Sequence, residues 1–129
     1  MERLFLMLSG TFGALGVAFG AFGAHGLRGY LATLADGADR RAWWETAAHY
    51  HLIHALAIGL AATVVGKREA STPAVVAGFC FAGGIVLFSG SLYAMTLTGM
   101  RALGALTPFG GGLFIAGWVG IAAQAWQMR

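Results

Sequence analysis

Residues 46–66 read TAAHYHLIHALAIGLAATVVG, a run of 21 positions without a single Asp, Glu, Lys or Arg. About 20 apolar residues of α-helix are needed to cross the ~30 Å hydrocarbon core of a bilayer. A helix suits that environment because it satisfies its own backbone hydrogen bonds, which lipid cannot do. This stretch is therefore predicted to span a membrane.

The remaining charges divide the rest of the chain in the same way. Three further uncharged stretches lie at 4–27, 70–100 and 102–128, and each is at least as long. The first is longer than the apolar core of a signal peptide, so we expect it to stay in place as a helix. The sequence predicts an all-α membrane protein with one integral membrane domain over 1–129. Its four transmembrane helices are expected at about 4–25, 40–65, 73–97 and 108–127.

The composition agrees with this prediction. Charged residues make up 10% of the 129 positions, against about 25% in soluble domains, and hydrophobic residues make up 58%. A soluble cytosolic enzyme is excluded, and the single cysteine excludes a disulfide framework. We expect a cell membrane, in the first instance the bacterial plasma membrane, with lipids as partners. The net charge of +3 is attributed to residues flanking the membrane, so no nucleic-acid partner is inferred.

The charges do not predict the orientation of the chain. Four Lys or Arg residues fall on each side of the expected helices, so the positive-inside rule gives a tie. Between the first two helices, the spacing of Leu27, Tyr30, Leu31 and Leu34 predicts a short amphipathic segment in the membrane interface. A partly ordered polar loop is the alternative. Thr-Pro pairs at 72–73 and 107–108, together with Asp39, are predicted to cap helix starts.

One face of the first helix is rich in glycine. Close backbone approach is a main source of packing energy between helices in lipid, and small residues permit it. We therefore expect this face to pack on another helix of the same chain, with a homo-oligomer or a larger membrane complex as the open alternative. The glycines of this face are Gly10, Gly13, Gly16, Gly20 and Gly23.

The polar residues of the expected helices are the candidate site. An ionisable residue at membrane depth is costly and is a functional candidate by default. His54 is the deepest histidine, and it shares a helix face with Tyr50 and Thr46. One interpretation is a polar pocket between the first three helices, and the other is a set of neutral hydrogen-bonded ties between helices. The residues in question are His25, Thr46, Tyr50, His54, Ser89, Ser91 and Tyr93.

The polar residues do not form a recognisable catalytic or cofactor-binding set. His51 lies three residues before His54, but no carboxylate or thiolate is expected near them, so no metal site is predicted. A haem with two histidine ligands would need facing histidines on two helices, and only His25 and His54 are candidates for such a pair. We therefore expect no catalytic residues, no metal and no cofactor.

Several short motifs give the chain a family resemblance. In order they are FGAHGL at 22–27, WETA at 44–47, HAL at 54–56, FSGSLY at 88–93 and TPFGG at 107–111. Together they resemble the YgdD/YwdK-type family of small four-helix membrane proteins, a domain of unknown function with eukaryotic transmembrane relatives. The resemblance implies a four-helix membrane protein and implies no activity, substrate or cofactor. It points to a set of signature residues: His25, Thr46, Tyr50, His54, Ser89, Ser91, Tyr93, Thr107 and Pro108.

Two functional hypotheses follow from the sequence. The first is a non-enzymatic membrane protein that supports membrane integrity or packs as an accessory subunit of a membrane complex. The second is a small carrier or a protein that binds a lipid or quinone in the His/Tyr pocket. Solid packing around His54 would count against the second hypothesis.

Overall fold

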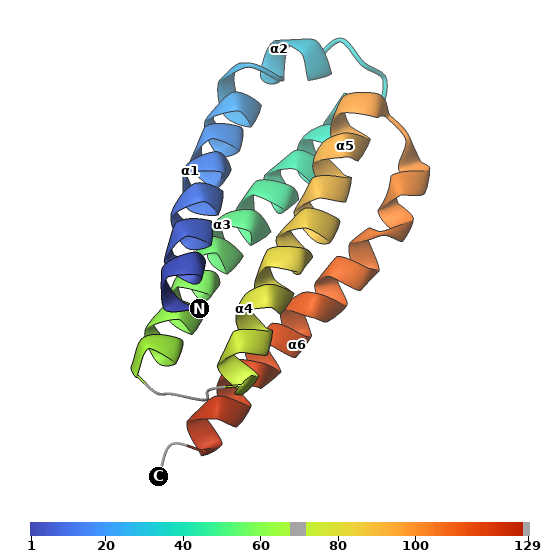
Figure 1. Ribbon diagram of the computed structural model, residues 1–129. Coiled ribbons are helices and arrows are strands. Elements are labelled where there is room, and N and C mark those ends of the chain that lie inside the picture. Colours follow the sequence, from blue (N-terminus) through green and yellow to red (C-terminus); the bar gives the residue numbers. More distant parts are fainter. Residues whose placement is uncertain (68–71, 128–129) are drawn as a thin grey trace.

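The computed structural model describes residues 1–67 and 72–127, and these contain no strand. Four helical segments are long and apolar enough to cross a membrane, which confirms the predicted fold class (Figure 1). Each predicted bound lies within three residues of the observed one. The segments are α1 (Glu2–His25), α3 (Gly37–Lys67), the third span formed by α4 (Thr72–Gly84), η1 (Ile85–Ser89) and α5 (Gly90–Thr98), and α6 (Thr107–Trp126). The short helix η2 (Arg101–Ala105) precedes α6 in the same apolar stretch.

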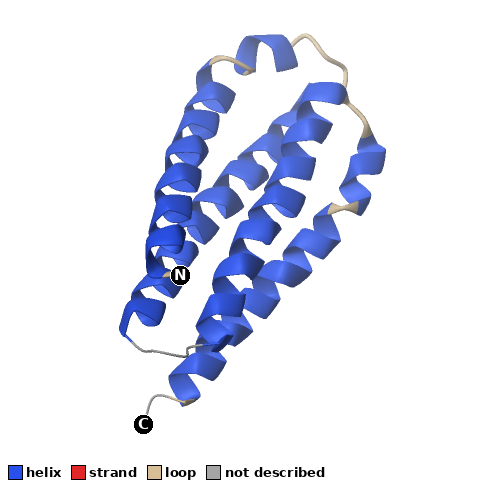
Figure 2. Ribbon diagram, viewed as in Figure 1, coloured by secondary structure: helices blue, strands red, loops and turns tan. Residues whose placement is uncertain are grey.

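The third helix of the chain, α3, is the centre of the bundle. It packs along α1 on one side and along α4, η1 and α5 on another, while α6 packs on α4 and η1. Figure 2 shows loops at both ends of α2 (Arg28–Leu31) and between α5 and α6. The buried side chains form two clusters, one around Phe5, Ile58 and Phe81 and the other around Trp44 and Leu92. The second cluster lies at the end of the bundle where α2 is found.

The connection between α1 and α3 contains the short helix α2 (Arg28–Leu31). Leu27 and Leu31 are buried against the bundle, so part of the predicted apolar stripe is confirmed. Tyr30 is instead 51% exposed. A single helical turn is too short to be stable alone, and it forms here because its leucines pack on the start of α3.

The third span is not a regular α-helix throughout. Residues Ile85–Ser89 form a π-helical segment, η1, in which the backbone hydrogen bonds run from i to i+5. This extra residue in the turn changes the direction in which Phe88 and Ser89 point. Phe88 lies directly on the backbone of α6, where a Cβ at Gly110 would overlap the Phe88 backbone. The sequence carries no signal for this irregularity.

Two of the predicted helix caps are wrong. Asp39 is not a cap because α3 begins at Gly37, and the Asp39 carboxylate instead pairs with Arg101 at 3.1 Å. Thr107 is the first residue of α6, and its hydroxyl bonds to the Ser91 hydroxyl at 2.8 Å. Thr72 begins α4, and the residue before it lies outside the described residues.

The glycine face of α1 is divided between contact and open space. A Cβ at Gly16 would lie 2.8 Å from the Leu52 side chain, and one at Gly23 would overlap the Trp44 indole. These two glycines therefore permit the close approach of α1 to α3. At Gly10, Gly13 and Gly20 an added Cβ would meet nothing within 4 Å. Three of the five predicted packing glycines therefore make no close helix contact with the described residues.

Candidate functional site

His54 is held on both sides of its ring. The Nδ1 atom lies 2.8 Å from the Tyr50 carbonyl, one turn earlier in α3, and Nε2 lies 3.2 Å from the Trp118 indole nitrogen of α6. An indole N–H can only donate, so Nε2 is the acceptor and the proton is on Nδ1, which donates to the carbonyl. The ring also stacks on Phe114, with centroids 3.5 Å apart and planes 8° apart. This imidazole has no free nitrogen with which to bind a ligand or transfer a proton.

Of the other candidate residues, only Tyr50 is hydrogen-bonded to His54 or stacked with it in the described part of the chain. The Tyr93 hydroxyl lies 3.3 Å from Nδ1 of His51, on the side of α3 that faces α1 and α5. Tyr50 lies on a different side, with its ring 4.7 Å from that of Phe88 and 5.9 Å from that of His54. The predicted pocket of His25, Tyr50, His54 and Tyr93 therefore does not form as one cavity.

The serines on the third span form hydrogen bonds within the protein. Ser89 is fully buried and donates to the Ala47 carbonyl of α3 at 2.9 Å. Ser91 contacts the Phe88 carbonyl at 2.9 Å and the Thr107 hydroxyl of α6 at 2.8 Å. Both residues join the third span to a neighbouring helix, which is the geometry of an interhelical tie. Thr46 is exposed on the surface of α3.

His51 is a residue that sequence reasoning undervalued. It is 3% exposed, packs edge-on against Phe12 and Phe19 of α1, and contacts Tyr93 of α5. Its Nε2 atom forms no hydrogen bond in the described part of the chain. Trp118 was also missed, although a tryptophan in the middle of a span needs a partner for its N–H group. The indole N–H of Trp118 could therefore have predicted a hydrogen bond to a polar group on another span, such as His54.

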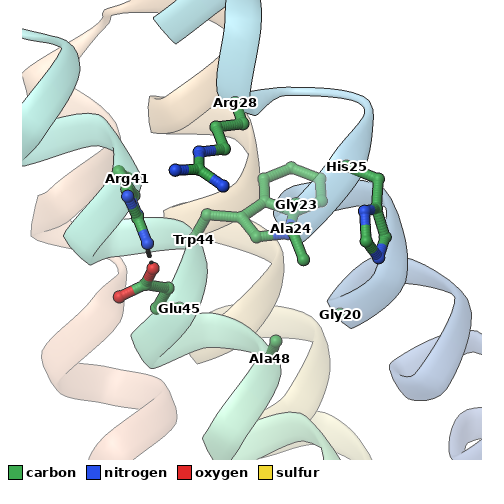
Figure 3. A pocket seen from close by; sticks show the side chains of 9 residues that line it. All are labelled: Gly20, Gly23, Ala24, His25, Arg28, Arg41, Trp44, Glu45 and Ala48. Carbon is green, nitrogen blue, oxygen red and sulfur yellow. Dashed lines mark hydrogen bonds and ion pairs between the residues drawn. The ribbon is translucent and has the colours of Figure 1, made fainter. Parts of the chain in front are cut away.

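An open pocket lies where α1, α2 and α3 meet at one end of the bundle. We call it the interfacial pocket, because its lining combines charged residues with the last turns of α1 and the first turns of α3. Its volume is about 430 Å³. The lining residues are Gly20, Gly23, Ala24, His25, Arg28, Arg41, Trp44, Glu45 and Ala48 (Figure 3).

The walls of the interfacial pocket differ in chemistry. On one side, Arg41 donates from Nε to Glu45 at 2.7 Å, one turn apart on α3. Figure 3 shows the Arg28 side chain extending toward the space between Arg41 and Trp44. His25 is exposed at the end of α1, on the other side of Trp44. The floor is made of small residues, so the backbone of α1 is within reach of a molecule in the pocket.

Arg28 gives this pocket its excess positive charge. The ion pairs of the described residues join Arg40 to Asp36, Arg41 to Glu45 and Arg101 to Asp39, and Arg28 takes part in none of them. The guanidinium group is always charged and presents planar N–H donors that match phosphate and carboxylate oxygens. Two guanidinium groups and one carboxylate therefore face the pocket, and one positive charge is left without a partner.

The Trp44 side chain fixes the inner wall of the pocket. Its indole N–H donates to the Phe19 carbonyl at 2.8 Å, which joins α3 to α1. The ring also packs against Tyr93, with centroids 4.5 Å apart. Gly23 leaves the space that the indole occupies. The pocket is thus built on a rigid contact between two spans, and its charged residues lie just outside that contact.

Known proteins similar to this chain are membrane proteins without an assigned activity. The chain is 42% identical to UPF0382 membrane protein YwdK of Bacillus subtilis (strain 168) over 82 residues, which are 64% of this chain and 67% of that protein. It is 40% identical to UPF0382 inner membrane protein YgdD of Escherichia coli (strain K12) over 82 residues, 64% of this chain and 62% of that protein. UPF0382 membrane protein SH2409 of Staphylococcus haemolyticus (strain JCSC1435) is 46% identical over 78 residues, 59% of this chain and 61% of its own length. No solved structure matches the chain.

A family model described as "Protein of unknown function (DUF423)" matches residues 19–111. That range holds the whole interfacial pocket, α3, the third span and the first turn of α6. Membership confirms the expected resemblance and agrees with the four membrane-length helices. This chain is a multi-pass membrane protein that belongs to the DUF423 family.

Proposed function

We propose that this protein is a non-enzymatic membrane component that supports the membrane by binding an anionic phospholipid, whose phosphate occupies the interfacial pocket. The observation that carries the proposal is the Arg28 guanidinium, which faces the pocket beside Arg41 without an ion-pair partner among the described residues. A phosphodiester brought between the two guanidinium groups would accept charge-assisted hydrogen bonds and reduce their repulsion.

The position of the pocket along the helices also supports a lipid ligand. Its charged residues lie at the ends of uncharged stretches, where the headgroups of a bilayer are found. Its small residues, such as Gly20 and Ala48, lie further into the spans. A phospholipid placed with its phosphate at Arg28 would therefore extend its acyl chains toward the bilayer centre.

A non-enzymatic role agrees with how the intramembrane polar groups are used. Both nitrogens of His54 are hydrogen-bonded within the protein, and the Ser89 hydroxyl is bonded to a backbone carbonyl. A general base or a nucleophile needs a lone pair or a proton free to reach a substrate. These side chains instead join helices, as neutral polar groups in membrane bundles commonly do.

The test is a comparison of lipid retention by matched arginine variants of the full chain. Phosphatidylglycerol and phosphatidylcholine are titrated onto the detergent-purified protein, and bound lipid is counted by native mass spectrometry. Arg28→Gln is expected to weaken phosphatidylglycerol binding at least tenfold, since a hydrogen bond to a charged group contributes about 1.5–3 kcal/mol and 1.4 kcal/mol is a factor of ten. Arg28→Lys keeps the charge but loses the planar donor array, so its binding should be intermediate.

Arg101→Gln is the matched control. It removes one positive charge at the same end of the bundle, but Arg101 is 65% exposed, pairs with Asp39 and does not line the pocket. Binding by this variant should stay within about twofold of the wild type, because an exposed ion pair contributes little. Equal losses in the Arg28→Gln and Arg101→Gln variants would mean that only the overall charge matters. That result, or equal retention of the two lipids by the wild type, would refute the proposed site.

A further inference from the structure

A second concavity lies on another side of α3, between α3 and α6 and beside η1. We call it the aromatic groove. Its volume is about 650 Å³, within the range of about 300–1,000 Å³ typical of small-molecule sites. Within residues 1–67 and 72–127, no Asp, Glu, Lys or Arg lines it. The groove therefore differs in chemistry from the interfacial pocket, which is lined by two guanidinium groups.

One wall of the aromatic groove is preformed by stacked rings. The rings of Tyr50, His54 and Phe114 are nearly parallel, with interplanar angles of 8° to 20°. Trp118 of α6 is held next to them by its hydrogen bond to His54. His54 and Phe114 are only 3% and 4% exposed, so the ring faces open to a ligand are those of Tyr50 and Trp118. Because the buried rings hold these two in place, the wall does not need to be ordered when a flat molecule stacks against it.

The groove has a polar end and an apolar end. At the polar end, Tyr50 is 39% exposed, and its hydroxyl has no hydrogen-bond partner within the described ranges. His49, beside it, is also exposed. These residues follow Glu45 by about one turn of α3, so they lie close to the membrane interface. Ile115 and Trp118 lie further along α6, toward the bilayer centre.

This distribution selects a ligand class. An anionic headgroup would meet no Arg or Lys here among the described residues, so it would leave water without a permanently charged partner, which is costly. A ligand with a neutral polar ring can accept a hydrogen bond from the Tyr50 hydroxyl, and an apolar tail can follow Ile115 toward the bilayer centre. We propose that the aromatic groove binds a ring-bearing prenyl lipid of the quinone class, with a ring carbonyl accepting from Tyr50. The proposal concerns binding only, and it is independent of the phospholipid site.

The experiment measures binding of decylubiquinone to the full chain in detergent, through the saturable quenching of tryptophan fluorescence. Gly112→Leu is the blocking variant. An added Cβ at Gly112 meets nothing within 4 Å, and the residue lines the groove, so a leucine there fills the groove without disturbing the bundle. Gly10→Leu is the matched control, because Gly10 is equally open but lies on α1. Tyr50→Phe removes only the hydroxyl.

The expected result is that Gly112→Leu raises the dissociation constant at least tenfold and Tyr50→Phe raises it about fivefold, while Gly10→Leu leaves it unchanged. Unequal effects of the two leucine variants place the ligand in the groove. Equal dissociation constants for Gly112→Leu and Gly10→Leu would overturn the proposal. So would displacement of decylubiquinone by a phospholipid with the same efficiency, since the groove would then select an apolar chain and not a ring. Arg28→Gln is expected to leave this binding unchanged, which separates the outcome from that of the phospholipid test.

Discussion

Replacing Gly23 with alanine should destabilise the bundle, whereas the same change at Gly13 should not. Both glycines lie on the face of α1 that the sequence predicts as a packing face. In the structure a Cβ at Gly23 would overlap the Trp44 indole, and a Cβ at Gly13 would meet nothing within 4 Å. Comparing the two substitutions therefore separates a glycine that permits a close helix contact from one that faces open space.

The magnitude follows from the contacts of Trp44. Moving the indole to admit a methyl group costs about 1–3 kcal/mol for an overpacked site. The bond from the indole N–H to the Phe19 carbonyl is 2.8 Å long, and its loss would cost about 0.5–1.5 kcal/mol. Replacing glycine by alanine within a helix stabilises the helix by about 1 kcal/mol through its higher helix propensity. We therefore expect Gly23→Ala to lower the free energy of unfolding by about 0.5–3.5 kcal/mol.

The assay is reversible unfolding in mixed micelles, followed by circular dichroism and tryptophan fluorescence. Gly13→Ala should be neutral or should raise the free energy of unfolding by up to about 1 kcal/mol, because it gains helix propensity without a clash. Equal free energies of unfolding for the two variants would contradict the contact between Gly23 and Trp44. Gly23→Ala should lower the free energy of unfolding by less in a Trp44→Phe background than in the wild type, because the smaller ring leaves room for the methyl group. That result would support the contact.

Three further predictions use the same unfolding assay. Trp118→Phe should lower the free energy of unfolding by about 1 kcal/mol, because it leaves His54 Nε2 without its hydrogen-bond donor. The same change should cost less in a His54→Phe background, and equal costs in both backgrounds would refute the pairing. Ser89→Ala should cost about 0.5–1.5 kcal/mol, since its buried hydroxyl is the donor to the Ala47 carbonyl, and a neutral result would contradict this tie. Gly99→Ala should cost about 1–2 kcal/mol because Gly99 has a φ of 74°, a region that L-residues enter with strain; an unchanged stability would rule out this conformation.

The spans were the most predictable part of the structure. Charged residues mark their ends directly, because an unpaired charge is costly in lipid, and the four uncharged stretches each became a membrane-length segment. The short α2 was also indicated, through the spacing of Leu27 and Leu31. The π-helical η1 was not predictable, because it depends on how Phe88 and Gly110 fit together across two spans.

The candidate site was less predictable than the spans. Sequence reasoning singled out His54, which is 3% exposed in the structure, but helical spacing cannot say which neighbour faces each nitrogen. The partner turned out to be Trp118, 64 positions further along the chain. His51 was undervalued for the same reason, since its contact with Tyr93 depends on the rotation of the third span about its axis. Arg28 was not predictable as a site residue, because its place beside Arg41 and its lack of an ion-pair partner among the described residues depend on the folded arrangement of α1, α2 and α3.

Every contact described above depends on four crossings of the membrane, and labelling of single cysteines from one side tests that arrangement most directly. The background is Cys80→Ala, and intact cells are treated with a maleimide that does not cross membranes, then compared with opened cells. The tested substitutions are Glu2→Cys, Thr33→Cys, Lys67→Cys, Met100→Cys and Gln127→Cys. The positions at 33 and 100 should react on one side of the membrane, and those at 2, 67 and 127 on the other, which also determines the orientation. If two consecutive positions of this series react from the same side, the chain does not cross the membrane between them. That result would contradict the four-helix account.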